Sequence, residues 1–443
     1  MRFILAAAFF LLTRPTHAEP AAARNLVIIA VDGLRADHLG LYGYTRETSP
    51  KLDARAKSAV VFDRAISQAS WTLPSFTTLF TSVDPIDHGV NTSHVTLSPG
   101  LRLLAEVLKD AGFETAGFVG GHFLDPVFGF ARGFDLYRAD GEGNYRFLPQ
   151  TAAQGADWIR GWKSGRHFLF IHGNDVHPPF DLTNQGAKVR HLFDADYRGP
   201  VDDTLIDYQF VAEYNKVSEE SQGLTPPPDY VRRVDQIRAD PRSVRHISAH
   251  YDAQIRHVDD TLVQVFGALA RTGHDADTIV VLLADHGLEM GEKGRLATAF
   301  HLTQYQSVVH VPLIFWVPGL PARRVSQPVE LLDVAPTLLE LLGLPPQSSY
   351  QGHSLAGLAR GKSEPPRLAF SSSSLIGDAR RDPPMFSVQD ERWKLIYDSI
   401  TRSRRLFDLA ADPQENVDVS GGHPKQLARL TQALADHIRR QVP

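Results

Sequence analysis

Four side chains that are far apart in the sequence could together form a site that attacks a charged ester. Thr72 lies in a short segment between Ser70 and Ser75, and Asp32 and the pair Asp285-His286 each follow a run of apolar residues. A free hydroxyl is a weak nucleophile near neutral pH and is activated by a nearby base or metal ion. A threonine facing two carboxylates and an imidazole therefore indicates a metal-activated nucleophile.

The nature of these ligands narrows the choice of metal. Asp32, Asp285 and His286 could hold a divalent cation, with Thr72 as a further ligand. An imidazole ligand favours zinc or manganese, because calcium prefers a shell made only of oxygen atoms. Zinc or manganese is thus the expected cofactor, and calcium remains possible.

Buried strands are expected to hold the two acids in place. Residues 25–32 and 278–285 are continuous apolar runs that each end in aspartate, and residues 167–172 and 311–317 are similar. Such runs are typical of strands buried on both faces of a parallel sheet. Ligands collect at the carboxyl ends of these strands, so Asp32 and Asp285 should converge on one crevice.

Helices alternate with these strands. Apolar residues recur at helical spacing over residues 50–58, 101–110, 251–269 and 334–342. The alternation predicts an α/β fold in which helices cover both faces of a large, mostly parallel sheet.

Two regions differ from this pattern. Residues 185–242 are polar and rich in proline, which indicates an insertion at the mouth of the crevice. Beyond residue 365, a hairpin over residues 385–389 and 393–397 and a last helix over residues 424–440 predict a smaller lobe with a short antiparallel sheet.

The N-terminus predicts where the protein is located, and the composition limits its partners. Residues 1–18 carry an early arginine, a short apolar run and a small-residue cleavage site, as a secretory signal does. We therefore expect export to the periplasm or medium with no stable membrane anchor. The chain has no cysteine, so no disulfide can form, and its net charge of -5 disfavours a nucleic-acid partner. A small anionic ester is the expected substrate, and the oligomeric state is left open.

Several strings, in order along the chain, resemble the sulfatases of the alkaline phosphatase superfamily. They are residues 31–43 (VDGLRADHLGLYG), 71–75 (WTLPS), 175–179 (DVHPP), 284–287 (ADHG) and 406–413 (LFDLAADP). The resemblance implies an alkaline phosphatase-like fold, a catalytic domain over residues 19–365 and a C-terminal subdomain over residues 366–443.

The chain departs from the sulfatase pattern at the nucleophile. Sulfatases have Cys or Ser, which is oxidised to formylglycine, at the start of a C/S-x-P-x-R string, whereas this chain has Thr72 and ends the string with Phe76. Threonine cannot give that aldehyde, because its β-carbon bears a methyl group. Thr72 instead resembles the nucleophile of superfamily members that attack phosphorus. Gly33 also stands where sulfatases add a second carboxylate.

The resemblance suggests roles for four more residues. His177 and His301 match positions that contact the transferred group, which implies catalytic roles. In the wider superfamily, histidines near these positions instead complete a second zinc site, with Asp175 as a possible partner, and Asp175 is otherwise a candidate substrate-binding residue. The lysine-containing G-K-W-H string of the family appears here as Gly120-Gly121-His122, which keeps only the histidine. His122 is therefore a candidate substrate-binding residue.

Three functions follow as hypotheses. The first is a metal-dependent hydrolase or transferase that cleaves a phosphoester or phosphodiester through Thr72. The second is a sulfuric ester hydrolase that works without formylglycine, and the third is a catalytically silent protein that binds anions. Simpler roles also exist, because Asp32 and Asp285 could cap the turns that follow them, Thr72 could be a turn hydroxyl, and His177 could be structural.

Overall fold

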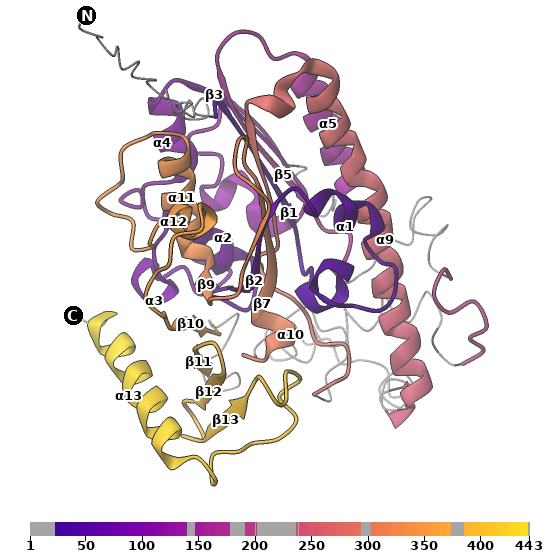
Figure 1. Cartoon of the computed structure of the whole chain (residues 1–443), viewed down its shortest axis with the longest axis vertical. Coiled ribbons are helices and arrows are strands. Elements are labelled where there is room, and N and C mark those ends of the chain that lie inside the picture. The colour runs from indigo at the N-terminus through magenta and orange to yellow at the C-terminus, as the bar shows by residue number, and fades with distance from the viewer. Residues whose placement is uncertain are drawn as a thin grey trace, which may run out of the picture.

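The computed structural model describes residues 23–139, 147–177, 191–199, 201, 236–237, 239–293, 303–373 and 385–441. A large sheet with strand order β4-β3-β5-β1-β6-β7-β2-β8, in which β9 also pairs with β2, forms the body of the molecule (Figure 1). The expected α/β architecture is confirmed.

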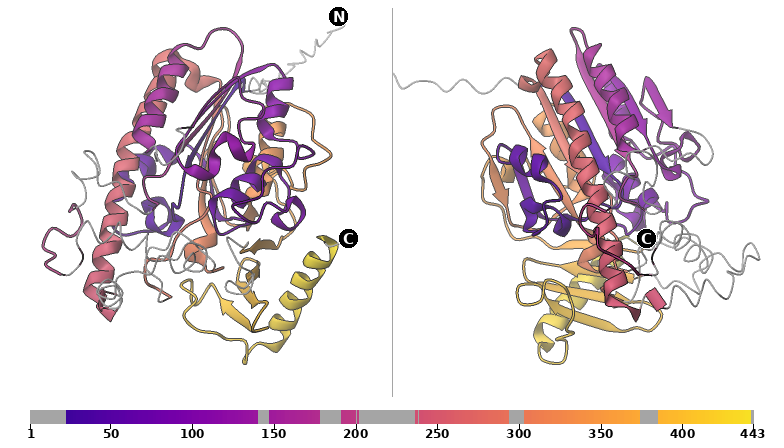
Figure 2. Two further views of the ribbon diagram at one scale, coloured as in Figure 1. Left: turned by 180° about the vertical axis from the view of Figure 1, so that it is seen from behind. Right: turned by 90° about the vertical axis from the view of Figure 1, so that its right-hand side faces the viewer.

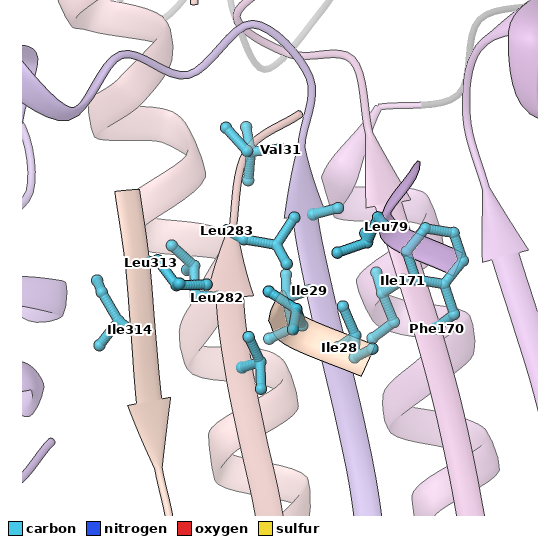
Figure 3. Packing of buried hydrophobic residues seen from close by; sticks show 14 of the residues in the cluster. Ile28, Ile29, Val31, Leu79, Phe170, Ile171, Leu282, Leu283, Leu313 and Ile314 are labelled. Atoms are coloured by element: carbon cyan, nitrogen blue, oxygen red, sulfur yellow. The ribbon is translucent and has the colours of Figure 1, made fainter. Parts of the chain in front are cut away.

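Parallel strands form the middle of the large sheet. β1 (Asn25–Val31) lies between β5 (Arg166–Gly173) and β6 (Thr278–Leu283) and is parallel to both. Every residue of β1 and β6 is buried, because helices cover both faces of the sheet. Figure 3 shows Ile28 and Ile29 of β1 packed beside Ile171, Leu282 and Leu283 of the neighbouring strands.

The sheet becomes mixed toward one edge. β3 (Phe113–Val119) and β4 (Leu136–Ala139) continue the parallel order beyond β5. On the other side, β7 (His310–Trp316) runs antiparallel to β6 and to β2 (Val60–Ile66). The short β8 (Arg323–Val325) and β9 (Val329–Glu330) pair parallel to β2.

Two groups of helices enclose the sheet (Figures 1 and 2). α5 (Leu148–Arg160) and α9 (Pro241–Thr272) pack together on one face, with α1 (Pro50–Ala56) against α9. The other face carries α2 (Thr72–Thr81), α4 (Leu104–Asp110) and α11 (Val334–Leu341). Short helices α3 (Pro85–His88), α10 (Gln306–Val309) and α12 (Ala356–Ala359) lie in the connections.

The C-terminal lobe is built as expected. β10 (Ala369–Ser372), β11 (Met385–Gln389), β12 (Trp393–Asp398) and β13 (Arg404–Asp408) form an antiparallel sheet, against which α13 (Pro424–Gln441) packs. This lobe has its own small apolar core and lies at the end of the large sheet where β1 finishes (Figure 1).

Several expected boundaries were wrong. The strands end before the acids, so Asp32 and Asp285 lie in the loops that follow β1 and β6. α4 begins at Leu104 rather than at residue 101, and α1 ends at Ala56. α9 begins at Pro241 rather than at residue 251, since Asp240 caps it by accepting hydrogen bonds from the amides of Arg242 and Ser243.

The remaining expectations fall largely outside the described residues. This applies to the signal segment 1–18 and to most of the insertion 185–242. Of the helices in the described ranges, none is both long enough and apolar enough to cross a bilayer.

Candidate active site

The four residues singled out from the sequence meet at one point. The Oγ1 atom of Thr72 lies 3.3 Å from Asp32 Oδ2 and 3.3 Å from His286 Nε2. The same His286 nitrogen lies 3.4 Å from Asp32 Oδ1 and 3.4 Å from Asp285 Oδ2. The hydroxyl, both carboxylates and the imidazole therefore face a common centre.

Strand pairing explains why the acids converge. β1 and β6 are parallel neighbours in which Ala30 pairs with Leu283, so Asp32 and Asp285 both lie two positions beyond this pair. The Gly33 amide donates to Asp285 Oδ1 at 3.3 Å, and the Ser75 hydroxyl donates to the Asp285 carbonyl at 2.7 Å. These bonds connect both loops to the start of α2.

The donor atoms suit a metal ion. Asp32 Oδ1 and Asp285 Oδ2 are buried and accept no hydrogen bond from any described residue, a costly arrangement unless a cation faces them. His286 Nδ1 lies 2.8 Å from the Gly287 carbonyl, which leaves Nε2 with its lone pair toward the acids. Ligands of a tetrahedral zinc ion at about 2.0–2.1 Å lie about 3.3 Å apart, close to the separations seen here.

His177 extends this candidate metal centre. Asp32, His177 and His286 each offer a ligand atom, and these atoms lie within 4.8 Å of one another. His177 follows β5 and meets His286 edge to face, with ring centroids 6.1 Å apart. His177 is therefore placed to contact either the metal or a group bound to it.

The electrostatics of the two acids also suit a cation. Burial, and then the neighbouring Asp32 carboxylate, raise the pKa of Asp285 well above its usual value. Burial opposes ionisation of Asp32 too, but His177, His172 and His286 outweigh it and lower the pKa of Asp32. Two buried carboxylates this close repel each other, and a divalent cation between them would keep both ionised.

Thr72 is the first residue of α2, and its side chain is only 6% exposed. The free backbone amides and the dipole at a helix N-terminus attract anions. The Thr72 hydroxyl therefore lies between the acidic cluster and a position where an anionic group would be stabilised.

His172, which the sequence analysis did not select, also lies in this cluster. Its Nε2 is 3.6 Å from Asp32 Oδ2, and its Nδ1 contacts the Gly120 carbonyl. Phe76, at the position where the sulfatase string has arginine, packs edge to face on His172 with ring centroids 5.1 Å apart. The sequence signal that could have identified His172 as a site residue was its position near the end of β5, the strand beside β1.

The other predicted residues have different surroundings. His122 Nδ1 lies 3.0 Å from Asp125 Oδ2, and the His122 side chain is 55% exposed. Asp175 is fully buried, and one of its oxygens accepts a hydrogen bond from the Leu148 amide at the start of α5. His301 lies outside the described residues.

These features define an α/β fold of the alkaline phosphatase type, with a candidate metal centre at the strand ends. The family model described as Sulfatase matches residues 24–344, and that described as N-sulphoglucosamine sulphohydrolase, C-terminal, matches residues 300–442. The chain belongs to the sulfatase family.

Known relatives share different amounts of the chain. Arylsulfatase K of Gallus gallus is 30% identical over 202 residues, so the match spans 44% of this chain but only 37% of that protein. The delta 4,5-hexuronate-2-O-sulfatase of Bacteroides thetaiotaomicron is 24% identical over 441 residues, which are 94% of this chain and 89% of that protein.

One solved structure with the same fold is named for a different activity. The phosphonate monoester hydrolase of Agrobacterium radiobacter superposes with a TM-score of 0.72 at 20% identity and covers 94% of this chain and 96% of its own. Other similar structures are described as a 2-O GAG sulfatase and as putative sulfatases.

Proposed function

We propose that this protein is a metal-dependent hydrolase that cleaves a phosphoester or phosphodiester with Thr72 as the nucleophile. The observation that carries the proposal is the Thr72 hydroxyl, which lies 3.3 Å from both Asp32 and His286 at the N-terminus of α2. A side-chain oxygen in this position can be activated on one side and can face an anionic ester on the other.

Asp32, Asp285 and His286 would hold the metal, with Thr72 as a further ligand. The mixed oxygen and nitrogen donors favour zinc or manganese. When bound, the cation would lower the pKa of the hydroxyl and balance charge on the ester oxygens.

The chain's own residues then account for the transfer. Asp32 accepts the hydrogen bond from the Thr72 hydroxyl and can take its proton as the Thr72 oxygen forms a bond to phosphorus. The bond between phosphorus and the alcohol oxygen breaks, and the departing alcohol takes the proton that Asp32 accepted from Thr72. Water then attacks the phosphorus atom of the Thr72 adduct, which releases the phosphate product and restores the Thr72 hydroxyl.

The remaining candidate residues would bind the ester. His177, beside His286, would contact the phosphoryl oxygens. We propose the same catalytic role for His301. We assign weaker, substrate-binding roles to His122 and Asp175, because His122 is exposed beside Asp125 and Asp175 already holds the start of α5.

Variants of Thr72 test the proposal directly. Thr72→Ala should abolish turnover of an aryl phosphodiester while metal content stays near that of the native protein, and Thr72→Ser should keep measurable activity. Thr81→Ala removes a hydroxyl from the far end of α2 and serves as the control. Full activity in Thr72→Ala would exclude Thr72 as the nucleophile.

A sulfuric ester is the second candidate substrate, because the relatives named arylsulfatase K and hexuronate-2-O-sulfatase act, by their names, on sulfate esters. Parallel assays with aryl sulfate and aryl phosphodiester separate the two functions. A sulfate rate above the phosphodiester rate would reverse our preference. The absence of turnover with either ester, and of bound metal, would favour a silent anion-binding protein.

Export and domain division belong to the same proposal. Residues 1–18 would direct the protein out of the cytoplasm, residues 19–365 would form the catalytic domain and residues 366–443 the C-terminal subdomain. The net charge of -5 disfavours a large polyanionic partner, so we propose a small anionic ester as the substrate. Sequencing the N-terminus of the exported protein would test the cleavage position.

A further inference from the structure

A second group of histidines lies on α9, apart from the residues of the candidate active site. His246 and His250 are one helical turn apart, and their Nε2 atoms are 3.0 Å from each other. Both side chains are buried, with relative exposures of 3% and 1%. Histidines spaced i, i+4 on one face of a helix can share one metal ion.

We propose that His246 and His250 bind a divalent transition metal of the zinc class at a second site. Two imidazole ligands of one tetrahedral zinc ion, each at about 2.0–2.1 Å, have nitrogen atoms about 3.3 Å apart. The observed 3.0 Å therefore needs only a small outward movement to admit the ion.

Asp194 orients the first of these ligands. Its Oδ2 atom lies 2.9 Å from His246 Nδ1, on the side of the ring opposite to His250. A carboxylate in this position accepts a hydrogen bond from Nδ1–H. The proton then stays on Nδ1, and the lone pair of Nε2 can bind a metal. The Arg242 guanidinium pairs with the same carboxylate and keeps it ionised.

His191 is the nearest further donor. Its ring centroid lies 6.1 Å from that of His250, so binding must draw the exposed His191 side chain inward to complete the ligand set. The three imidazoles would favour zinc, cobalt, nickel or copper over calcium or magnesium, which prefer oxygen ligands.

The site would fasten the segment 191–199 to α9. Tyr197 of this segment stacks on His246 with ring centroids 3.7 Å apart, and its hydroxyl bonds Ser243 at 2.7 Å. Figure 1 shows the segment beside the N-terminal part of α9. Tyr251, the residue after His250, donates a hydrogen bond to the Gly33 carbonyl at 2.8 Å. α9 therefore links this site to the loop that carries Asp32.

Metal stoichiometry tests the inference with zinc or cobalt as the only added ligand. After chelation and reloading, the full-length protein should hold one equivalent more than His246→Asn or His250→Asn. Asp285→Asn should lose the active-site metal but keep this one, and His94→Asn, which alters an exposed histidine, should match the native protein. Asp194→Asn should weaken binding about 10-fold to 100-fold.

A second measurement covers the case in which the histidine variants fail to fold. In the Asp285→Asn background, zinc should slow trypsin cleavage after the exposed Arg198 at least tenfold, because the segment becomes held against α9. Equal metal content in the native protein and a folded His246→Asn variant would show that the two rings only share a hydrogen bond. Unchanged cleavage at Arg198 with added zinc would also overturn the proposal.

Discussion

At Gly33 the backbone adopts φ +73°, a conformation that side chains with a β-carbon rarely take. A β-carbon there would also lie 2.9 Å from Leu288 Cδ2, and Leu288 is fully buried. The sulfatase carboxylate expected at this position therefore has neither a suitable backbone nor space. The absence of this ligand agrees with a metal centre that includes histidine.

This residue supports a prediction about stability. Gly33→Ala should lower the free energy of unfolding by more than the roughly 1–2 kcal/mol typical of left-handed strain alone, because Leu288 must also move. Gly89→Ala is a matched control, since Gly89 has φ +68° and open space around it. Urea denaturation of both variants measures the difference. Equal losses would mean that Leu288 moves aside at no cost.

At the scale of elements, Arg35 joins the loops that follow β1 and β6. Its buried guanidinium donates to Asp37 through two nitrogen atoms, to Glu292 at 2.6 Å and to the Leu288 carbonyl at 3.0 Å. Burial alone would raise the pKa of Asp37 and Glu292, but Arg35 outweighs it and lowers both. Their ionised forms thus stabilise the folded protein.

The sign of this linkage predicts acid sensitivity. A carboxylate whose pKa is lowered by folding contributes stability above its ordinary pKa of about 4, and this stability is lost as the pH falls below that value. The unfolding free energy should therefore decrease between about pH 5 and pH 3. Arg35→Met should cost about 3–5 kcal/mol at pH 7 and make the decrease with acid smaller.

A surface pair provides the comparison for Arg35. Arg360→Met breaks an exposed contact with Glu340 and should change stability by at most about 1 kcal/mol. Denaturant titrations at several pH values give both quantities. An Arg35→Met variant with the native pH dependence would contradict this role for the Asp37 and Glu292 carboxylates.

Sequence patterns predict a helix or strand well when its formation depends only on its own residues. β1 and β6 were predictable because they are continuous apolar runs, and each acid follows its run directly. The first ten residues of α9 were not, because His246 lies against Asp194 and Tyr197 of a segment that is distant in the sequence. His172 was missed as a member of the site because its proximity to Asp32 depends on β5 lying beside β1, which is a property of strand order.

At the scale of the whole molecule, a buried ion pair within the C-terminal lobe also contacts the large lobe at the start of α10. Lys394 of β12 and Glu415 are 2.9 Å apart, with side-chain exposures of 0% and 1%. Glu415 also accepts a hydrogen bond from the Gln306 amide at the start of α10. Burial lowers the pKa of Lys394, and the Glu415 carboxylate opposes that shift.

Breaking this pair should destabilise the whole protein. Glu415→Gln leaves Lys394 without its counter-charge and should cost about 3–5 kcal/mol, whereas the double variant Lys394→Met/Glu415→Leu should recover much of the loss. Arg429→Met, which breaks a surface pair with Asp390, is the control. Circular dichroism in urea measures each value, and a Glu415→Gln loss below about 0.5 kcal/mol would contradict the role of the pair.

The most direct test of the proposed chemistry is to trap the covalent intermediate. The protein, loaded with zinc or manganese, is mixed with an aryl phosphodiester, quenched in acid within milliseconds and digested, and the peptide that contains Thr72 is analysed by mass spectrometry. We expect a phosphoryl adduct on Thr72 that is absent from Thr72→Ala. Rapid turnover with an unmodified Thr72, or an adduct on another residue, would show that the Thr72 hydroxyl is not the nucleophile.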